Sequence, residues 1–304
     1  MKTTKNMIPH ACKLLQGRVV ADVILNETED ELQRMHLQRP PCVAFLRVGN
    51  DGASVSYVAQ KEKVAHTIGI KSILKVFDPA QITEGQLIGE IKSLNLDTSV
   101  DGILVQSPLP KAIDFVNVCN AIHPNKDVDG FGAENLGRLL QEKNGFTPCT
   151  PAGIVELLKF YNISPAGKHV VIVNRSLIVG KPLAALLTKH SIWGNATVTL
   201  CHSHSQNLPQ LTRQADILVL ACGKPGYFDA HFVKPATILI DVGITRISDN
   251  SPRGYSLQGD ANFEAVSPIV QAITPVPGGV GPLTVALLMR NTLQAFKLQN
   301  NFAT

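Results

Sequence analysis

The sequence has little of what marks a secreted, membrane-bound or nucleic-acid-binding protein. Its six cysteines are scattered, with no Cys-x-x-Cys pair and no histidine spaced to complete a zinc site, so we expect reduced structural thiols and no metal. No run reaches the about 18 apolar residues that cross a bilayer, and residues 1–16 lack the apolar core of a secretory signal. The net charge of +4 is spread without a dense block of lysine or arginine. We therefore expect a cytoplasmic protein with neither a nucleic-acid nor a membrane partner.

What the sequence does contain is the alternation of apolar strands and helices that is typical of an α/β protein. At 304 residues, 44% hydrophobic and 17% charged, the chain is long enough for two domains of about 150 residues each. Alternation of strand and helix calls for parallel pairing. Strands are expected at 42–48, 70–77, 100–106, 169–173, 196–201, 216–221 and 237–242. Helices are expected within 8–39 and over 53–69, 83–94 (with Thr83 as N-cap), 114–122, 151–161 and 283–298.

The stretch from Val48 to Lys61 is the first candidate for chemistry. A Gly49/Gly52 turn permits tight backbone geometry between a buried strand and a helix. Tyr57 and Lys61 are four residues apart, so they lie on one face of that helix. A lysine beside a phenol in a partly dry cleft can lose its proton near neutral pH and act as a general acid or base. An isolated Tyr-x-x-x-Lys is more often a surface pair, so the assignment depends on the neighbouring motifs.

Polar residues at the end of the third expected strand should lie near the Gly49/Gly52 turn, at the carboxyl edge of the predicted sheet. Ligands of an open parallel sheet gather beyond the carboxyl ends of the strands, which places Gln106 near the Gly49 turn. Its amide both donates and accepts, and so could orient Lys61 or a bound heterocycle. Asp127 and Asp129 flank Val128 further along. They could form a solvated turn, or one of them could accept paired N–H donors from a ligand ring.

The second half of the chain carries a possible dinucleotide site. The segment Asn174–Pro182 links a strand to a helix whose N-terminus would offer free amides to phosphate, but only Gly180 remains of the Gly-x-Gly-x-x-Gly fingerprint. The next strand ends in His202-Ser203-His204-Ser205, where an NAD site usually has an acid for the ribose. With Arg175 nearby, this composition would accept a 2′-phosphate instead, which favours NADP over NAD.

Taken together, these segments resemble the bifunctional methylenetetrahydrofolate dehydrogenase/cyclohydrolase family along essentially the whole chain. Any one block is a modest signal, but six in this order with these spacings are hard to obtain by chance. The blocks are Val48-Gly49…Ala53-Ser54…Tyr57-Val58…Lys61, Asp101–Gln106…Pro108-Leu109-Pro110, Lys126–Phe131, Pro148-Cys149-Thr150-Pro151, Arg175-Ser176…Ile178–Pro182 and Thr274–Pro282.

The resemblance implies an α/β fold of two domains with a folate-binding cleft between them. An N-terminal three-layer α/β catalytic domain would span 1–149 and be completed by a returning helix at 283–304, and a Rossmann-like NAD(P)-binding domain would span 150–282. The protein would usually be a homodimer. It would oxidise 5,10-methylenetetrahydrofolate with NADP and hydrolyse the resulting methenyl compound to 10-formyltetrahydrofolate.

The resemblance also implies roles for individual residues. Lys61 would be the catalytic lysine, Tyr57 would stack beside the pterin, Gln106 would tune the lysine, and Asp129 would hold the pterin ring. The other expected folate contacts are Val105, Ser107, Pro275, Val276, Pro277, Gly278 and Gly279. The expected cofactor contacts are Asn174, Arg175, Ser176, Ser203 and Ile244.

Some departures and alternatives stay open at this point. Asn174 stands where the family commonly has glycine, which adds a side chain near the pyrophosphate and puts cofactor affinity in doubt; Ser107 and Gly132 also depart from the common pattern. Short-chain dehydrogenases share Tyr-x-x-x-Lys, but their dinucleotide loop precedes the pair. A non-enzymatic nucleotide-binding sensor, or a family member with only one of the two activities, remains an alternative.

Overall fold

The computed structural model describes residues 12–35, 37–251 and 254–302, and the chain forms two compact units. Among the described residues, the three-stranded unit comprises 21–35, 37–152 and 284–302, and the six-stranded unit comprises 12–20, 153–251 and 254–283. Residues 12–20, expected within the 1–149 domain, group with the six-stranded sheet in this division. The reason is a short strand, β1 (Lys13–Leu14), which pairs in parallel with β11 (Ala272–Ile273) of the larger sheet.

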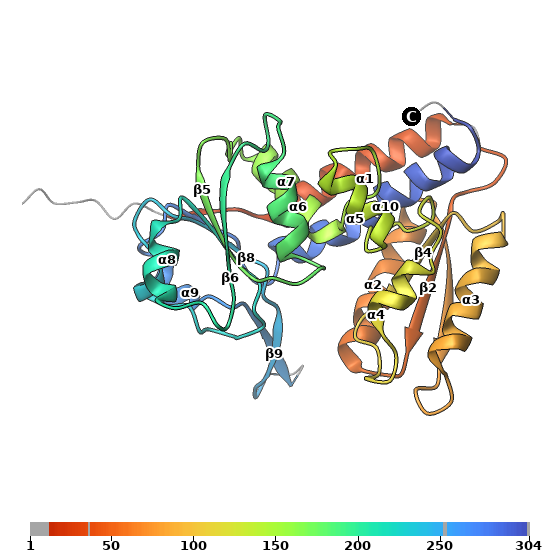
Figure 1. Ribbon diagram of the computed structural model, residues 1–304, viewed down its shortest axis with the longest axis horizontal. Helices are drawn as coiled ribbons and strands as arrows, with labels where there is room; N and C mark the ends of the chain where they lie inside the picture. The colour runs from red at the N-terminus through yellow and green to blue at the C-terminus, as the bar shows by residue number, and fades with distance from the viewer. Residues whose placement is uncertain (1–11, 36, 252–253, 303–304) are drawn as a thin grey trace, which may run out of the picture. The chain divides into compact units, whose positions relative to one another are not determined.

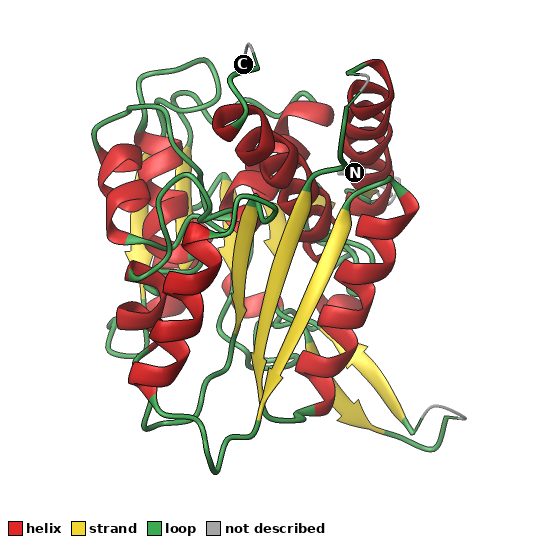
Figure 2. Cartoon of the chain, turned by 90° about the vertical axis from the view of Figure 1, so that its right-hand side faces the viewer, coloured by secondary structure: helices red, strands yellow, loops and turns green. Residues whose placement is uncertain are grey.

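The three-stranded unit is built on a parallel sheet with the order β3-β2-β4 (Figure 2). Its strands are β2 (Cys42–Val48), β3 (Lys71–Phe77) and β4 (Gly102–Gln106), within two residues of the expected runs. All seven residues of β2 are buried, because this central strand is covered on both faces. Its register places Arg47 opposite Gln106, so the two side chains lie on the same face.

Side-chain hydrogen bonds cap the first turns of two helices in this unit. In α2 (Gly52–Thr67) the carboxylate of Asp51 accepts the Ser54 N–H, which caps the first turn. In α3 (Glu84–Leu96) the predicted N-cap Thr83 is confirmed, and it forms a capping box with Gln86. The other helices, labelled in part in Figure 1, are α1 (Gly17–Arg34), α4 (Phe115–Asn120), α5 (Ala133–Leu140) and α10 (Val280–Gln299).

One face of the small sheet packs against α3. Ala44 and Leu46 of β2 belong to a buried cluster with Leu87 and Ile91 of that helix. On the opposite face, Phe45 is fully buried. Alternate side chains of one strand therefore supply both cores, and the rim at its carboxyl end is left for polar groups.

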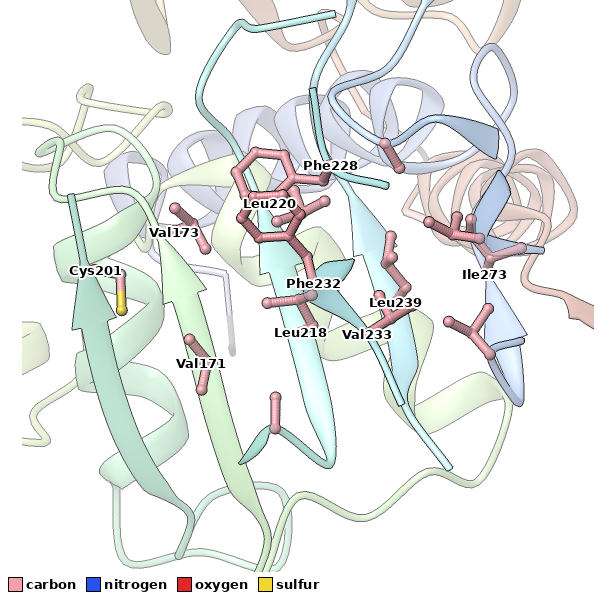
Figure 3. Close-up of a cluster of buried hydrophobic side chains, with 14 residues drawn as sticks. Val171, Val173, Cys201, Leu218, Leu220, Phe228, Phe232, Val233, Leu239 and Ile273 are labelled. Carbon is pink, nitrogen blue, oxygen red and sulfur yellow. The ribbon is translucent and has the colours of Figure 1, made fainter. Parts of the chain in front are cut away.

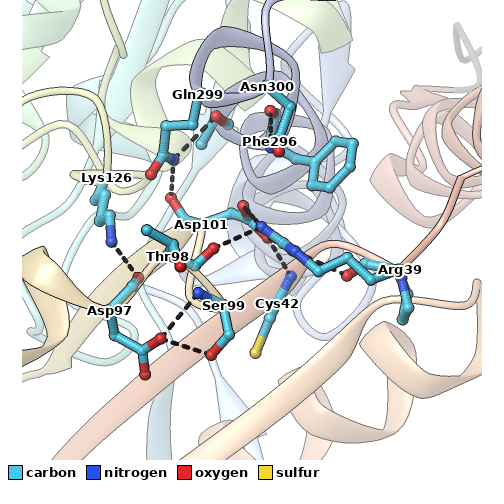
Figure 4. A network of polar contacts seen from close by, with 12 residues as sticks. Arg39, Cys42, Asp97, Thr98, Ser99, Asp101, Lys126, Phe296, Gln299 and Asn300 are labelled. Atoms are coloured by element: carbon cyan, nitrogen blue, oxygen red, sulfur yellow. Dashed lines mark hydrogen bonds and ion pairs between the residues drawn. The ribbon is translucent and has the colours of Figure 1, made fainter.

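A polar network fixes α10 to this unit (Figure 4). The Arg39 guanidinium donates to both carboxylate oxygens of Asp101, at 2.7 and 2.8 Å, and lies over the Phe296 ring of α10. The Gln299 amide donates to the Asp101 carbonyl at 2.8 Å. Nearby, Lys126 Nζ donates to two carbonyls at the end of α3. The C-terminal helix and the loop after Lys126 are thus both held by buried or half-buried polar contacts.

The six-stranded unit contains a parallel sheet with the order β1-β11-β8-β7-β5-β6. Its central strands are β5 (His169–Val173), β6 (Thr197–Cys201), β7 (Ile217–Leu220) and β8 (Ile238–Asp241). The chain runs from β5 to β6 on one side and then to β7 on the other, so strand order reverses between β5 and β7. Such a switch point is where doubly wound sheets bind their ligands.

Helices and a hairpin complete this unit. One face of the sheet supplies a buried cluster in which Phe228 and Phe232 meet edge to face at 4.9 Å, with Val171 and Leu218 below them (Figure 3). The hairpin in this unit was not predicted from the sequence. The elements are α6 (Cys149–Phe160), α7 (Gly180–Thr188), α8 (Leu208–Gln214), α9 (Phe263–Val266), the 3-10 helix η1 (Ala230–Phe232) and the hairpin β9–β10 (Thr245–Ser248 and Tyr255–Gln258). Within the described parts of the chain, none of the helices is both long and apolar enough to cross a membrane.

Candidate active site

Lys61 is held by the strand-turn-helix unit that precedes it. Gly49 has φ +82°, a conformation that favours glycine, and it lets β2 turn directly into α2. The Lys61 side chain is only 8% exposed, and its Nζ donates to Oε1 of Gln106 at 3.0 Å. The Gln106 amide in turn donates to the Ser107 carbonyl at 2.7 Å. The amide is therefore oriented at both ends, and it fixes where the amine lies.

Asp129 is the acidic partner of this lysine. Its carboxylate accepts from the backbone N–H and the thiol of Cys149, the first residue of α6, and it interacts electrostatically with Lys61. Sequence reasoning treated Cys149 as one of six structural thiols and so missed this contact. The available signal was its position within a matched block, Pro148-Cys149-Thr150-Pro151.

Burial shifts the protonation equilibria of all three groups. Desolvation lowers the pKa of Lys61, although Asp129 and Cys149 oppose the shift. Desolvation raises the pKa of Asp129, opposed by Lys61 and by the hydrogen bonds from Cys149. Burial, with the neighbouring Asp129 charge, raises the pKa of the Cys149 thiol well above its usual range. The thiol therefore stays protonated and acts as a hydrogen-bond donor, while Lys61 is placed to exchange a proton.

The two acids of the Asp127-Val128-Asp129 segment have different environments. Asp127 is 2% exposed, and its oxygens accept from the backbone N–H groups of residues 130–132 and from the Asn135 amide. Its two oxygens therefore accept from the loop that follows it and from the first turn of α5. Asp129 is half-buried and faces Lys61. Asp127 therefore stabilises its loop, and Asp129 is available to the site. The sequence did not decide between these two roles.

The remaining residues expected around folate fall into two groups. Tyr57 lies one helical turn before Lys61 on α2 and is 36% exposed, and Val105 and Ser107 flank Gln106, the former buried and the latter half-buried. The expected contacts Pro275, Val276, Pro277, Gly278 and Gly279 lie in the six-stranded unit, directly after β11. The structure thus brings Tyr57, Lys61, Gln106 and Asp129 into one unit with Cys149.

The expected dinucleotide turn follows β5, and Asn174 braces it. The side-chain oxygen of Asn174 accepts from Ser176 N at 2.8 Å, Ser176 Oγ at 2.7 Å and Gly180 N at 3.0 Å. Its amide nitrogen donates to the Ala221 carbonyl at the end of β7. A side chain at Gly180 would meet the Asn174 backbone. Asn174 is thus directed inward, where it ties the ends of β5 and β7 together.

The other expected cofactor residues lie along the carboxyl ends of the same sheet. Arg175 and Ser203 are exposed after the adjacent parallel strands β5 and β6, and Ile244 is 40% exposed after β8. No acidic residue follows β6, where His202 and His204 flank Ser203. Among the described residues, no group of three or more His, Cys, Asp or Glu side chains is arranged to hold a metal ion.

Two buried acids behind this rim were not singled out from the sequence. Asp241, at the end of β8, accepts from the N–H groups of Gly243, Asp260 and Ala261 at 2.8 to 3.0 Å. Asp260 accepts from three consecutive N–H groups, those of residues 222–224 after β7. Desolvation raises the pKa of Asp241 to about 7. The pair fixes the loops after β7 and β8 to each other.

Comparisons with known proteins match both halves of the chain to one family. The catalytic domain of the tetrahydrofolate dehydrogenase/cyclohydrolase family matches residues 15–129, and the NAD(P)-binding domain of the same family matches residues 148–300. Bifunctional protein FolD of Pelodictyon phaeoclathratiforme is 49% identical over 294 residues, covering 95% of this chain and 99% of that protein. FolD of Flavobacterium psychrophilum is 46% identical over 285 residues, with 93% and 97% coverage.

Solved structures give the same result. The bifunctional FolD of Campylobacter jejuni superposes with a TM-score of 0.88 at 40% identity, covering 95% of this chain and 99% of that one. The Trypanosoma brucei enzyme, solved with NADP and an inhibitor, also gives 0.88 at 35% identity, with 94% and 98% coverage. The chain therefore belongs to the tetrahydrofolate dehydrogenase/cyclohydrolase family.

Proposed function

We propose that this protein catalyses two consecutive reactions of folate one-carbon metabolism. It oxidises 5,10-methylenetetrahydrofolate to 5,10-methenyltetrahydrofolate with NADP, and it hydrolyses the methenyl compound to 10-formyltetrahydrofolate. NADP, when bound, supplies the acceptor for the hydride that leaves the methylene carbon. The protein contributes mainly alignment to this first step and proton transfer to the second.

The observation that carries the proposal is the buried Lys61 amine between an oriented amide and an acid. Burial lowers the Lys61 pKa, so a larger fraction of the amine is neutral near neutral pH. The neutral amine takes one proton of the water that attacks the methenyl carbon and returns it to the ring nitrogen as the bond between that nitrogen and the carbon breaks; the second proton of the water is released to solvent as the formyl C=O forms. Gln106 holds Nζ in place by accepting from it at 3.0 Å. The ionised carboxylate of Asp129 accepts paired N–H donors of the pterin.

The rim of the six-stranded sheet supports NADP as the cofactor. The Asn174–Gly180 turn leads into the N-terminus of α7 at the β5 strand end, where phosphate is commonly held. Arg175 and Ser203 are exposed on adjacent strand ends, with no acid after β6 to repel a 2′-phosphate. The T. brucei relative was solved with NADP, which agrees with this choice. Ser176, Ile244 and the loop Pro275–Gly279 stay proposed contacts of cofactor and folate.

The test is to follow the absorbance of reduced nicotinamide while the protein is mixed with 5,10-methylenetetrahydrofolate and each cofactor separately. A signal with NADP and none with NAD supports the proposal, and the opposite result overturns the phosphate argument. Loss of methenyltetrahydrofolate absorbance without cofactor reports the hydrolysis. A protein with neither signal would be the nucleotide-binding sensor, and a protein with one signal would be a monofunctional family member.

We also propose a homodimer that forms through the edge strand β3. Among the strands of the described residues, β3 pairs with β2 alone, and its residues Ile73, Leu74 and Val76 are 36%, 38% and 48% exposed. An apolar edge strand is usually covered by another chain or protected by charge. Light scattering of the purified protein should give twice the chain mass; a monomer would contradict the proposal. The cytoplasmic location stays a prediction, supported by six free cysteines.

A further inference from the structure

The residues around the start of α1 hold both ends of the loop Pro275–Gly279, which we call the folate loop after its proposed role. Just before the loop, the Leu15 N–H donates to the Ile273 carbonyl at 2.8 Å, as part of the pairing of β1 with β11. Near its other end, the Arg18 N–H donates to the Gly278 carbonyl at 3.0 Å. These residues all belong to the six-stranded unit. One short stretch of chain therefore fixes where the folate loop begins and where it ends.

This stretch, Lys13–Arg18, is the N-terminal segment, and it is itself held by Tyr161, the residue that follows α6. The Tyr161 hydroxyl accepts from the Gln16 N–H at 2.9 Å, and Lys13 Nζ lies 5.0 Å from the centre of the Tyr161 ring. Leu15, between these two contacts, is fully buried. The N-terminal segment is thus fixed along its length, so it can support the folate loop.

Gly17, the first residue of α1, is where the backbone of the segment meets the backbone of the loop. A Cβ atom at this position would lie 1.9 Å from the Gly279 carbonyl oxygen and 3.2 Å from the Leu283 side chain. The φ of Gly17 lies outside the left-handed region, and alanine favours a helix over glycine by up to about 1 kcal/mol, so the helix does not require glycine here. The folate loop excludes a side chain instead, because the contact with Gly279 would have to open from 1.9 Å to at least 3.0 Å.

We propose that Gly17 is a positioning residue for the folate site, which lets the N-terminal segment lie against the folate loop and so sets where the backbone of that loop meets the substrate. The inference rests on the proposed function, because it assigns the folate loop to the substrate. A side chain at Gly17 displaces the loop and weakens folate binding. The proposed NADP contacts after β5 and β6 follow other strands of the sheet, so cofactor binding should not change.

The experiment compares Gly17→Ala with the matched control Gly85→Ala. Gly85 lies in the first turn of α3, and among the described residues a Cβ atom there would meet nothing within 4 Å apart from the backbone of its own helix. The KM and kcat of hydrolysis are measured without cofactor, the KM for 5,10-methylenetetrahydrofolate is measured in the oxidation, and the Kd for NADP is measured by fluorescence without folate.

We expect Gly17→Ala to raise the folate KM about 10-fold in both reactions, because misplacing a binding group by an ångström can cost up to about 10²-fold. The kcat values and the NADP Kd should change by less than about 2-fold, and Gly85→Ala should match the wild type in every measurement. Hydrogen exchange gives a local readout of the same effect. In Gly17→Ala, amide exchange should become faster in a peptide covering 274–283 and stay unchanged in peptides covering β5 and β6.

Several outcomes overturn the inference. A merely structural Gly17 would lower stability in Gly17→Ala and leave the folate KM unchanged, and a general loosening of the unit would weaken NADP and folate binding equally. If Gly17→Ala does not fold, Tyr161→Phe tests the same segment, because it removes only the hydroxyl that bonds to the Gln16 backbone. It should raise the folate KM about 3-fold, and an unchanged KM would contradict the inference.

The wild type separates this inference from the proposed function. A wild type with neither activity would refute the proposed function itself. An active wild type whose Gly17→Ala variant keeps the wild-type folate KM would refute only the role of Gly17.

Discussion

Both units bury carboxylates at the ends of their strands, but the partners of these acids differ. In the six-stranded unit, Asp241 and Asp260 are surrounded by backbone N–H groups from two loops. In the three-stranded unit, Asp129 faces the amine of Lys61 and the thiol of Cys149. Backbone N–H donors keep their protons, whereas the Lys61 amine can exchange a proton. Burial and a raised pKa therefore do not by themselves mark a catalytic acid; the partner decides.

The contrast recurs within a single loop. Asp127 and Asp129 are two residues apart and both have a raised pKa because of burial. Asp127 uses its oxygens on residues 130–132 and Asn135, so it serves the backbone. The Asp129 carboxylate instead interacts with Lys61. Substitutions that change one kind of partner at a time can test whether this division of roles is correct.

The largest expected effect is on Lys61. Lys61→Ala removes the proton-transfer group, and hydrolysis of methenyltetrahydrofolate should fall by about 10³-fold, the usual scale of general acid-base catalysis. Stopped absorbance assays at several pH values measure it. Lys63→Ala is the matched control, because Lys63 is an exposed lysine on the same helix. Hydrolysis at the wild-type rate in Lys61→Ala would refute the assignment.

The next comparison is between the two acids of the loop. Asp129→Asn should leave stability nearly unchanged but reduce kcat/KM for folate about 10²-fold, because the pterin loses its charged acceptor. Asp127→Asn should instead cost about 2 kcal/mol of stability, because one of the two oxygens, which each accept from two N–H groups, is replaced by an NH2 donor. Urea unfolding and steady-state kinetics on both variants separate the two. The reverse pattern would show that the roles have been exchanged.

In the six-stranded unit, the buried carboxylate of Asp241 should make the free energy of unfolding depend on pH. Asp241 has a folded-state pKa raised to about 7, so its ionisation opposes folding, and its contribution to stability falls as pH rises through the range between its unfolded and folded pKa values. The stability of the wild type relative to Asp241→Asn should therefore fall by about 2 kcal/mol between about pH 5 and about pH 7.

Asp216 provides the control for this measurement. Its pKa is lowered, chiefly by the His169 backbone N–H, so it is ionised in both states across the same range. The difference between wild type and Asp216→Asn should be flat there and change only in more acidic solution. A flat difference for Asp241→Asn as well would mean that this acid is already ionised in the folded protein.

The smallest expected effect concerns Asn174. Asn174→Ala removes the acceptor of Ser176 and Gly180 and the donor to Ala221. We expect a loss of about 1 kcal/mol in stability and a rise in the KM for NADP, with hydrolysis unaffected. Tighter NADP binding in Asn174→Ala would instead show that this side chain obstructs the pyrophosphate, the concern raised by its place in the sequence.

Much of the local structure could be predicted because it depends on neighbours in the chain. The strand at Cys42–Val48 and the capping box at Thr83 follow from an apolar run and from hydroxyl and amide groups three residues apart. The hairpin at 245–258 and the helix α5 were not predicted; both have periodic patterns, but the strands have only four residues each and the helix only eight. The N-terminal strand β1 has only two residues and exists only because β11 accepts it.

The residues of the candidate site also differ in whether they could be predicted from the sequence. Tyr57 and Lys61 could be paired from helical spacing alone, and Gln106 could be placed at the same rim from the parallel order of the strands. Cys149 and Asn291 could not, because their contacts to the segment around Asp129 come from helices far along the chain. No local pattern encodes which side of a distant helix will meet a given loop.

The sequence by itself determined the strand-turn-helix that presents Lys61, the alternation that makes two parallel sheets, and the identity of the groups available for chemistry. The tertiary structure alone decided which of two neighbouring acids faces the lysine, which of the six cysteines lies beside that acid, and that α10 reaches the same loop. The physical reason is that periodicity and capping act over a few residues, whereas protonation depends on burial and on charges brought together by packing.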